Sequence, residues 1–167
     1  MGSKRVGHAR IAALINKNKN KIQIQKPEFL KVTDHLQLDG SQSGKTILWG
    51  PADAGLAADA VVYLPKSPTE GMYFRFVYVG GAADAHDLQI STRSDDNWFI
   101  GGLVQHDPDD AGDDAVVYHP NLTSNSKVNI LTPDAGTVIE LWCDGTYWFL
   151  SGRVISATNA AVTWADQ

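Results

Sequence analysis

From Val32 onward, short runs of β-branched and aromatic residues alternate with turns, and this pattern constrains the fold more than any other feature. The runs are mostly four to nine residues long, as in DAVVYL, GMYFRFVYV and TVIELWC. Gly, Pro, Asp and Asn separate them at the spacing expected of an all-β sandwich or barrel. No long helical period follows residue 31. We therefore expect residues 32–167 to form an all-β domain, an antiparallel two-sheet sandwich of jelly-roll-like type.

The run MYFRFVYV, residues 72–79, predicts which side chains of one strand face the core. Successive side chains of a strand point to opposite faces of the sheet. One face therefore holds mainly large apolar groups, and we expect it to be the core face. Its residues are Met72, Phe74, Phe76 and Tyr78, and the opposite face carries Tyr73, Arg75, Val77 and Val79.

The stretch DGSQSGKT, residues 39–46, ends like a phosphate-binding loop. The Walker A pattern places four residues between its first glycine and the GK pair, whereas only three follow Gly40 here. Asp39 stands where that glycine belongs, and Gly50-Pro51 would break a helix that began after the loop. The sequence therefore excludes a nucleotide site here and favours a hairpin connection between the runs HLQL and TILW.

Two pairs of segments resemble each other within the chain. PADAGLAADAVVYLP at 51–65 resembles PDDAGDDAVVYHP at 108–120, and NWFIGG at 97–102 resembles YWFLSG at 147–152. Similar turns can reuse the same residues, because Pro sets φ, Asp caps and Gly takes the left-handed position. The alternative is a duplicated half-sandwich with two related sheets, and both interpretations stay open.

Charge is distributed unevenly along the chain. Residues 1–31 hold eight basic residues and one acid, a charge of +7, while the remaining 136 residues hold six basic and 18 acidic groups, a charge of −12. A basic arm on an acidic body indicates an acidic partner, which includes another copy of the same protein. We expect a docking arm over residues 1–31 and the sandwich domain over 32–167.

Part of this arm has the pattern of a short amphipathic helix. Ile11, Leu14 and Ile15 lie at i, i+3 and i+4, with Val6 about one turn earlier. A helix of this length is marginal alone, so we expect it to become ordered on a partner. The candidate partner-docking residues are Arg5, Val6, Arg10, Ile11, Leu14 and Ile15.

The sequence argues against nucleic acid and membrane as partners. The arm has no aromatic residue before Phe29, and the acidic body would repel a polyanion. No apolar run approaches the roughly 20 residues of a membrane helix.

No residue pattern indicates an enzyme or a cofactor. The five histidines have no ligand spacing, and one cysteine gives no zinc pattern. Cys143 lies in the strand-like run IELWC, where we expect a small buried side chain. The Asp-rich loop 107–114 does not fit an EF-hand, and whether it binds a cation stays open.

Two segments of the chain, SKRVGHARIAALIN at the start and ELWCDGTYWFLSGRV near the end, are similar to parts of known proteins. The opening SKRVGHARIAALIN is similar to the basic arm that begins many virion structural proteins of marine tailed bacteriophages. The segment ELWCDGTYWFLSGRV, which begins at Glu140, resembles a strand–DGT turn–strand hairpin of capsid-decoration, head-fibre and tail-fibre domains. The resemblance covers about the first 16 residues and this hairpin.

The resemblance implies a virion structural protein without catalytic residues, assembled in the cytoplasm of a host bacterium. The expected function is that of a capsid decoration (cement) protein that binds and stabilises the head shell through its arm. Its partners would be the major capsid protein or other virion subunits, and copies would form a homo-oligomer, with a trimer favoured. The alternatives are a receptor- or glycan-binding module of a head or tail fibre, or a tail or portal connector component.

Overall fold

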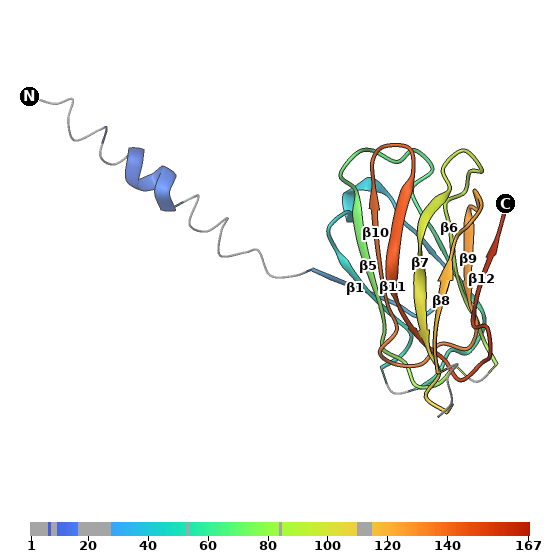
Figure 1. Ribbon diagram of the computed structural model, residues 1–167. Helices are drawn as coiled ribbons and strands as arrows, with labels where there is room; N and C mark the ends of the chain where they lie inside the picture. The colour runs from blue at the N-terminus through green and yellow to red at the C-terminus, as the bar shows by residue number, and fades with distance from the viewer. Residues whose placement is uncertain (1–6, 8–9, 17–27, 53, 84, 110–114) are drawn as a thin grey trace, which may run out of the picture.

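The computed structural model of the chain describes Gly7 and residues 10–16, 28–52, 54–83, 85–109 and 115–167. Two β-sheets pack face to face, and residues 10–16 form a short helical segment (Figure 1). The strands are β1 (Phe29–Val32), β2 (Leu36–Gln37), β3 (Thr46–Trp49), β4 (Ala60–Tyr63), β5 (Tyr73–Tyr78), β6 (Leu88–Ser91), β7 (Phe99–His106), β8 (Val116–Pro120), β9 (Lys127–Ile130), β10 (Val138–Cys143), β11 (Trp148–Ile155) and β12 (Val162–Ala165).

Both sheets mix parallel and antiparallel strands. The seven-stranded sheet has the order β1-β3-β5-β10-β11-β7-β8, and the five-stranded sheet has the order β12-β9-β6-β4-β2. Five of the ten strand pairs in the described residues are parallel. The expected two-sheet sandwich is therefore confirmed, whereas the antiparallel, jelly-roll-like strand arrangement is wrong.

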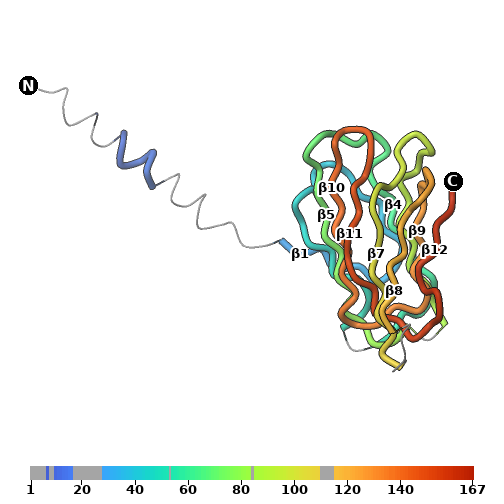
Figure 2. Tube along the Cα trace, in the orientation of Figure 1, coloured from blue at the N-terminus to red at the C-terminus, as the bar shows by residue number. Residues whose placement is uncertain are grey.

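The path of the chain explains the parallel pairs. From β1 to β6 the chain alternates between the two sheets, so that neighbours within a sheet are separated by a strand of the other sheet. When the chain comes back to a sheet after one strand in the other sheet, the new strand runs parallel to the previous strand of that same sheet. Figure 2 follows this path along the Cα trace, which enters through β1 at one edge of the seven-stranded sheet.

The segment DGSQSGKT connects the two sheets, so the hairpin expectation is wrong. Asp39 caps a single 3₁₀ turn, Gly40–Gln42, with its carboxylate accepting from the backbone N–H of Ser41 at 2.8 Å. The side chain of Gln42 accepts in return from the N–H of Asp39 at 2.8 Å. This reciprocal cap fixes the start of the 3₁₀ turn, which connects β2 of one sheet to β3 of the other.

The DGT turn forms the tight hairpin that the sequence suggested. β10 and β11 pair antiparallel, and the carboxylate of Asp144 accepts from the N–H groups of Thr146 and Tyr147, each at 2.8 Å. These hydrogen bonds, of which the one from Tyr147 has the larger effect, hold the pKa of the Asp144 carboxyl below its usual value. Gly145 takes the positive φ of 101° that the turn requires.

The core lies between the two sheets, and the predicted core face of β5 is confirmed. Met72, Phe74, Phe76 and Tyr78 are buried, whereas Arg75 points to solvent. Aromatic rings pack against each other at tilted angles in the interior: Phe74 and Trp148 have ring centroids 5.9 Å apart. Phe99 of β7 and Trp164 of β12, which come from opposite sheets, lie 6.2 Å apart. Cys143 is buried and unpaired, as its strand position predicted.

The repeated segments occupy different environments. The DAVVY residues form β4, which has parallel neighbours on both sides, and again the edge strand β8, which pairs only with β7. The NWFIGG and YWFLSG segments instead lie side by side, with Phe99 of β7 paired to Trp148 of β11. These placements favour reuse of local turn chemistry over a duplicated half-sandwich.

A buried polar cluster ties β7 to β8 and to the segment before β12. Gln105 is 3% exposed, and its amide donates to the carbonyl of Thr158 at 2.7 Å while accepting from the N–H of Ala161 at 2.8 Å. His119 Nε2 lies 3.0 Å from the same Gln105 oxygen. Burial lowers the pKa of His119 from its usual 6.5, so the folded protein favours the neutral ring.

Truncation of the core should cost far more than truncation of an exposed aromatic. Phe74→Ala removes a side chain that is 0% exposed and should reduce the free energy of unfolding by about 3–5 kcal/mol. Phe29→Ala removes a ring that is 59% exposed and should change it by less than about 0.5 kcal/mol. Denaturant titration of both variants measures the difference, and equal losses would contradict this assignment of the core.

His119 should make stability fall in mild acid. Because its pKa is lowered in the folded state, the unfolded chain binds the proton more readily below about pH 6.5. The free energy of unfolding should therefore decrease as the pH falls through 6.5 and level off below the folded pKa. Urea unfolding of wild type and His119→Gln between about pH 7.5 and pH 5.5 tests this, and the variant should show a shallower slope. Identical slopes in the two proteins would exclude His119 as the cause of the pH dependence of stability.

Candidate functional site

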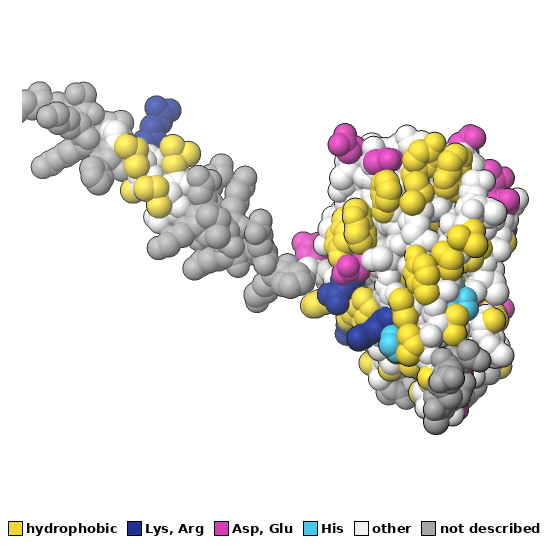
Figure 3. All heavy atoms as spheres, in the orientation of Figure 1, with side chains coloured by type: hydrophobic (Ala, Val, Ile, Leu, Met, Phe, Trp, Pro, Cys, Tyr) yellow, Lys and Arg dark blue, Asp and Glu magenta, His cyan; other side chains and the backbone are white. Residues whose placement is uncertain are grey.

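A row of large apolar side chains crosses the outer face of the seven-stranded sheet. The strand register places Tyr73 of β5 beside Trp142 of β10, Trp142 beside Phe149 of β11, and Phe149 beside Ile100 of β7. The side chain of Trp142 is 43% exposed, and its ring lies 6.3 Å from that of Tyr73. Figure 3 looks onto this face and shows hydrophobic side chains gathered over it. We call Tyr73, Trp142, Phe149 and Ile100 the aromatic row.

A polar row lies next to the aromatic row, one step along the strands. Arg75 of β5 faces Glu140 of β10, and Glu140 faces Ser151 of β11. Arg75 Nε lies 3.4 Å from Glu140 Oε1, and the Tyr73 hydroxyl donates to the same oxygen at 3.1 Å. Burial, with the Glu140 hydrogen bond, raises the pKa of the Tyr73 phenol. The two rows are therefore joined through Glu140.

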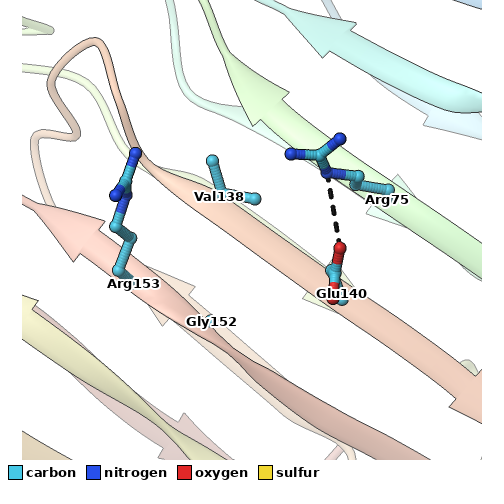
Figure 4. Close-up of a pocket in the computed structure, with 5 residues that line it drawn as sticks. All are labelled: Arg75, Val138, Glu140, Gly152 and Arg153. Atoms are coloured by element: carbon cyan, nitrogen blue, oxygen red, sulfur yellow. Dashed lines mark ion pairs between the residues drawn. The ribbon is translucent and has the colours of Figure 1, made fainter.

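A shallow depression of about 390 Å³ opens beside this polar row (Figure 4). It is lined by Arg75, Val138, Glu140, Gly152 and Arg153. Figure 4 shows the two arginines on either side of Val138, one from β5 and one from β11. Arg153 Nε donates to the carbonyl of Gly136 at 3.0 Å, which fixes the position of its guanidinium.

Gly152 allows β10 and β11 to approach each other at the depression. A Cβ atom built on it would lie 2.2 Å from the carbonyl oxygen of Val138, and its φ is +157°. A side chain here would collide with backbone that cannot yield. Glycine thus keeps the hairpin closely paired under the exposed residues.

The outer face of this sheet also concentrates positive charge. Lys31, Arg75 and Arg153 point outward from its strands, and Glu140 is the one carboxylate at the outward strand positions described. The domain as a whole carries six basic and 18 acidic residues after residue 31. The acidic side chains in the view of Figure 3 lie mainly near the margins of the face, with one beside the basic cluster. A local excess of cations on an acidic body favours an anionic ligand at this place.

The outer face of the five-stranded sheet has a different character. Gln89 donates through its amide to Asn129 at 2.6 Å, and Asn129 donates to Thr163 at 3.3 Å. These side chains form a polar ladder across β6, β9 and β12 and satisfy one another. This sheet also has an exposed aromatic residue, Tyr63, with Arg93 5.9 Å from its ring centre. The continuous row of apolar side chains across four strands, beside Arg75 and Arg153, therefore distinguishes the seven-stranded sheet as the candidate binding face.

The predicted arm residues lie outside this face. Residues 10–16 are helical, and Ile11, Leu14 and Ile15 are 58%, 59% and 57% exposed. None of the three belongs to the core cluster or packs against it. Arg10 is also exposed on this segment, whereas Arg5 and Val6 lie outside the described residues. The helical stripe expected from the spacing is thus present and uncovered.

Sequence reasoning did not single out the aromatic row. The run ELWC alternates, which places Glu140 and Trp142 on one face and Leu141 and Cys143 on the other. This alternation could have shown that Trp142 is exposed beside a carboxylate. Its neighbour Phe149 follows from the β10–β11 hairpin, whereas its neighbour Tyr73 depends on the strand order, which no local pattern contains.

Within the described residues, no group of three or more His, Cys, Asp or Glu side chains could hold a metal ion. The Asp-rich loop 107–114 lies partly outside those residues; in the described part, Asp107 accepts from the N–H of Asp109 at 2.9 Å. Burial raises the pKa of the Cys143 thiol, which opposes formation of a nucleophilic thiolate. None of the described helices is long and apolar enough to cross a membrane.

Comparisons with models of protein families, with curated proteins and with solved structures found no match for this chain. The functional argument therefore rests on the geometry of the candidate binding face and the arm.

The link between Tyr73 and Glu140 can be measured by titration. The phenol of Tyr73 should ionise above its usual pKa of 10.0, because it is partly desolvated and donates to a carboxylate. Glu140→Gln should lower that pKa toward the ordinary value without restoring it fully, since desolvation is the larger cause. Ultraviolet absorbance titration, with Tyr73→Phe to assign the transition, tests this. An unchanged transition in Glu140→Gln would show that the carboxylate does not act on Tyr73.

Proposed function

We propose that this protein is a structural component of a bacteriophage particle, a capsid decoration protein that attaches through its N-terminal arm. The observation that carries the proposal is the uncovered apolar stripe of Ile11, Leu14 and Ile15 on the helical segment. The resemblance of the arm and of the β10–β11 hairpin to virion proteins supports the choice of partner, as does the lack of a catalytic arrangement in the sequence.

The physical basis of attachment is burial of the stripe together with charge. Burying one such aliphatic side chain contributes about 1.5–3 kcal/mol, which offsets the entropy lost when the arm becomes ordered. The arm carries eight basic residues and one acid, so an acidic groove on a capsid subunit would receive both its apolar and its charged faces. This is the helix-in-groove mode of recognition, with anchors at i, i+3 and i+4.

The sandwich would then stand on the particle surface as a rigid module. Its core is closed between two sheets, and the arm connects it to the shell. Neighbouring copies would form a homo-oligomer, for which a trimer is the arrangement we favour. A tail or portal connector, the remaining alternative, would occur in few copies per particle, whereas a decoration protein covers the shell.

Two matched variants test attachment through the stripe. Leu14→Asp places a charge within the stripe and should reduce occupancy on shells that lack the protein by about tenfold or more, because burial of a carboxylate is costly. Ala13→Asp adds the same charge away from the stripe, about 200° around the helix from Ile11 and from Ile15 and about 100° from Leu14, and should bind nearly as wild type. Quantitative gel analysis of sedimented shells measures occupancy.

Deletion of residues 1–26 should abolish attachment while leaving the sandwich folded, because the core residues and those packed against them all lie after residue 26. Circular dichroism confirms folding of the truncated chain. Wild-type occupancy by this chain, or equal loss in the two aspartate variants, would refute attachment through the arm.

A second candidate function is glycan binding by the sandwich, as in a fibre or receptor-binding module. The observation that favours it is the aromatic row beside Arg75 and Glu140. Protein sites for sugars combine aromatic surface with fixed polar groups, and both are present on this face. The two functions use different parts of the chain and are compatible in one protein.

A further inference from the structure

We propose that the outer face of the seven-stranded sheet binds a saccharide that carries a carboxylate, with Trp142 as the stacking surface and Arg75 and Arg153 as the carboxylate-binding groups. The inference deepens the second candidate function, on which it rests, and is independent of attachment through the arm.

The stacking surface is provided by Trp142 and its neighbours. The indole is 43% exposed although it lies on a strand that is paired on both sides, with Tyr73 on one side and Phe149 on the other. An exposed ring held by strand pairing has little conformational entropy to lose on binding. The apolar face of a pyranose ring can cover such a surface, while its hydroxyl groups remain at the margin.

Hydrogen-bonding groups lie directly beside this surface. Glu140 is two residues from Trp142 on the same side of β10, about 7 Å along the strand. It accepts from Tyr73 and pairs with Arg75 at 3.4 Å, so its position is fixed. The side chains of Arg75 and Glu140 are 45% and 38% exposed and remain accessible to a ligand. A carboxylate and a guanidinium together can accept from and donate to sugar hydroxyls.

The arginines distinguish an acidic saccharide from a neutral one. Arg75 and Arg153 flank the depression of about 390 Å³ (Figure 4), and the one carboxylate that lines it, Glu140, lies beside Arg75 and not between the two arginines. Arg153 uses its Nε to hold the carbonyl of Gly136 at 3.0 Å, an arrangement that positions the guanidinium before a ligand arrives. A guanidinium binds a carboxylate through paired hydrogen bonds, which makes arginine the suitable residue for this task.

Spacing and overall charge indicate a short, sparsely charged ligand. Trp142 and Val138 are four residues apart on β10, about 13 Å, and Arg153 pairs with Val138. A short oligosaccharide can cover this distance, stacking at one end and placing its carboxylate at the other. A nucleic acid carries a charge on every nucleotide and would be repelled by a domain with 18 acidic and six basic residues after residue 31.

The test uses the full chain and two matched pairs of ligands. Sialyllactose is compared with lactose, and trigalacturonate with its methyl ester, by isothermal titration calorimetry. We expect at least one acidic member to bind, and its neutral counterpart to bind about tenfold or more weakly, which corresponds to about 1.4 kcal/mol. Trp142→Ala and Arg153→Gln should each weaken the acidic ligand by about tenfold or more. Leu122→Ala, at a residue that is 86% exposed and outside the face, should leave binding unchanged.

Other outcomes would overturn the inference in different ways. Equal binding of acidic and neutral members would leave the second candidate function in place and remove the role of the arginines. If none of the four saccharides bound at about millimolar concentration, both the second candidate function and the role of the arginines would be refuted. A change of oligomeric state in Trp142→Ala, measured by light scattering, without saccharide binding by the wild type, would show an interface between copies. Binding of a single-stranded oligonucleotide through the same residues would indicate nucleic acid instead. The occupancy of shells, which tests the arm, is unaffected by any of these results.

Discussion

Burial of two sheet faces against each other is the constraint on which the rest of this structure depends. Large aromatic side chains such as Phe74, Trp148 and Phe99 fill the space between the sheets, and Trp164 reaches them from the opposite side. Because side chains alternate along each strand, fixing the inward residues also fixes those that point outward. The exposed row on the seven-stranded sheet is therefore a consequence of core packing as much as of its own contacts.

The elements of the fold could be predicted locally, but their arrangement could not. Alternation in 72–79 identifies the core face of β5, and turn residues mark where most strands end. Alternation is the same whichever way a neighbouring strand runs, so it contains no information on direction. The segment 39–46 shows the limit, since a compact capped turn serves equally well to fold back within a sheet or to cross to the other one.

The two candidate sites differ in how well they could be predicted from the sequence. The arm stripe depends on a spacing of three and four residues, so Ile11, Leu14 and Ile15 could be named directly. The aromatic row instead combines residues from β5, β10, β11 and β7, which are far apart in the chain. One site belongs to a single helical segment, and the other exists only once the sheet has formed. Together they would let one chain hold a surface with its arm and present a second surface to solvent.

The position of the β10–β11 hairpin has a consequence for the order in which the protein folds. This hairpin stands between β5 and β7, so without it the larger sheet would consist of two separate pieces, β1-β3-β5 and β7-β8. Both pieces precede it in the chain and must keep their edges unpaired until it arrives. Closure over such sequence separations is slow compared with formation of a local hairpin, and unpaired edges favour association with other chains. The tight DGT turn shortens this exposed period, because it lets the last two central strands enter as a preformed unit.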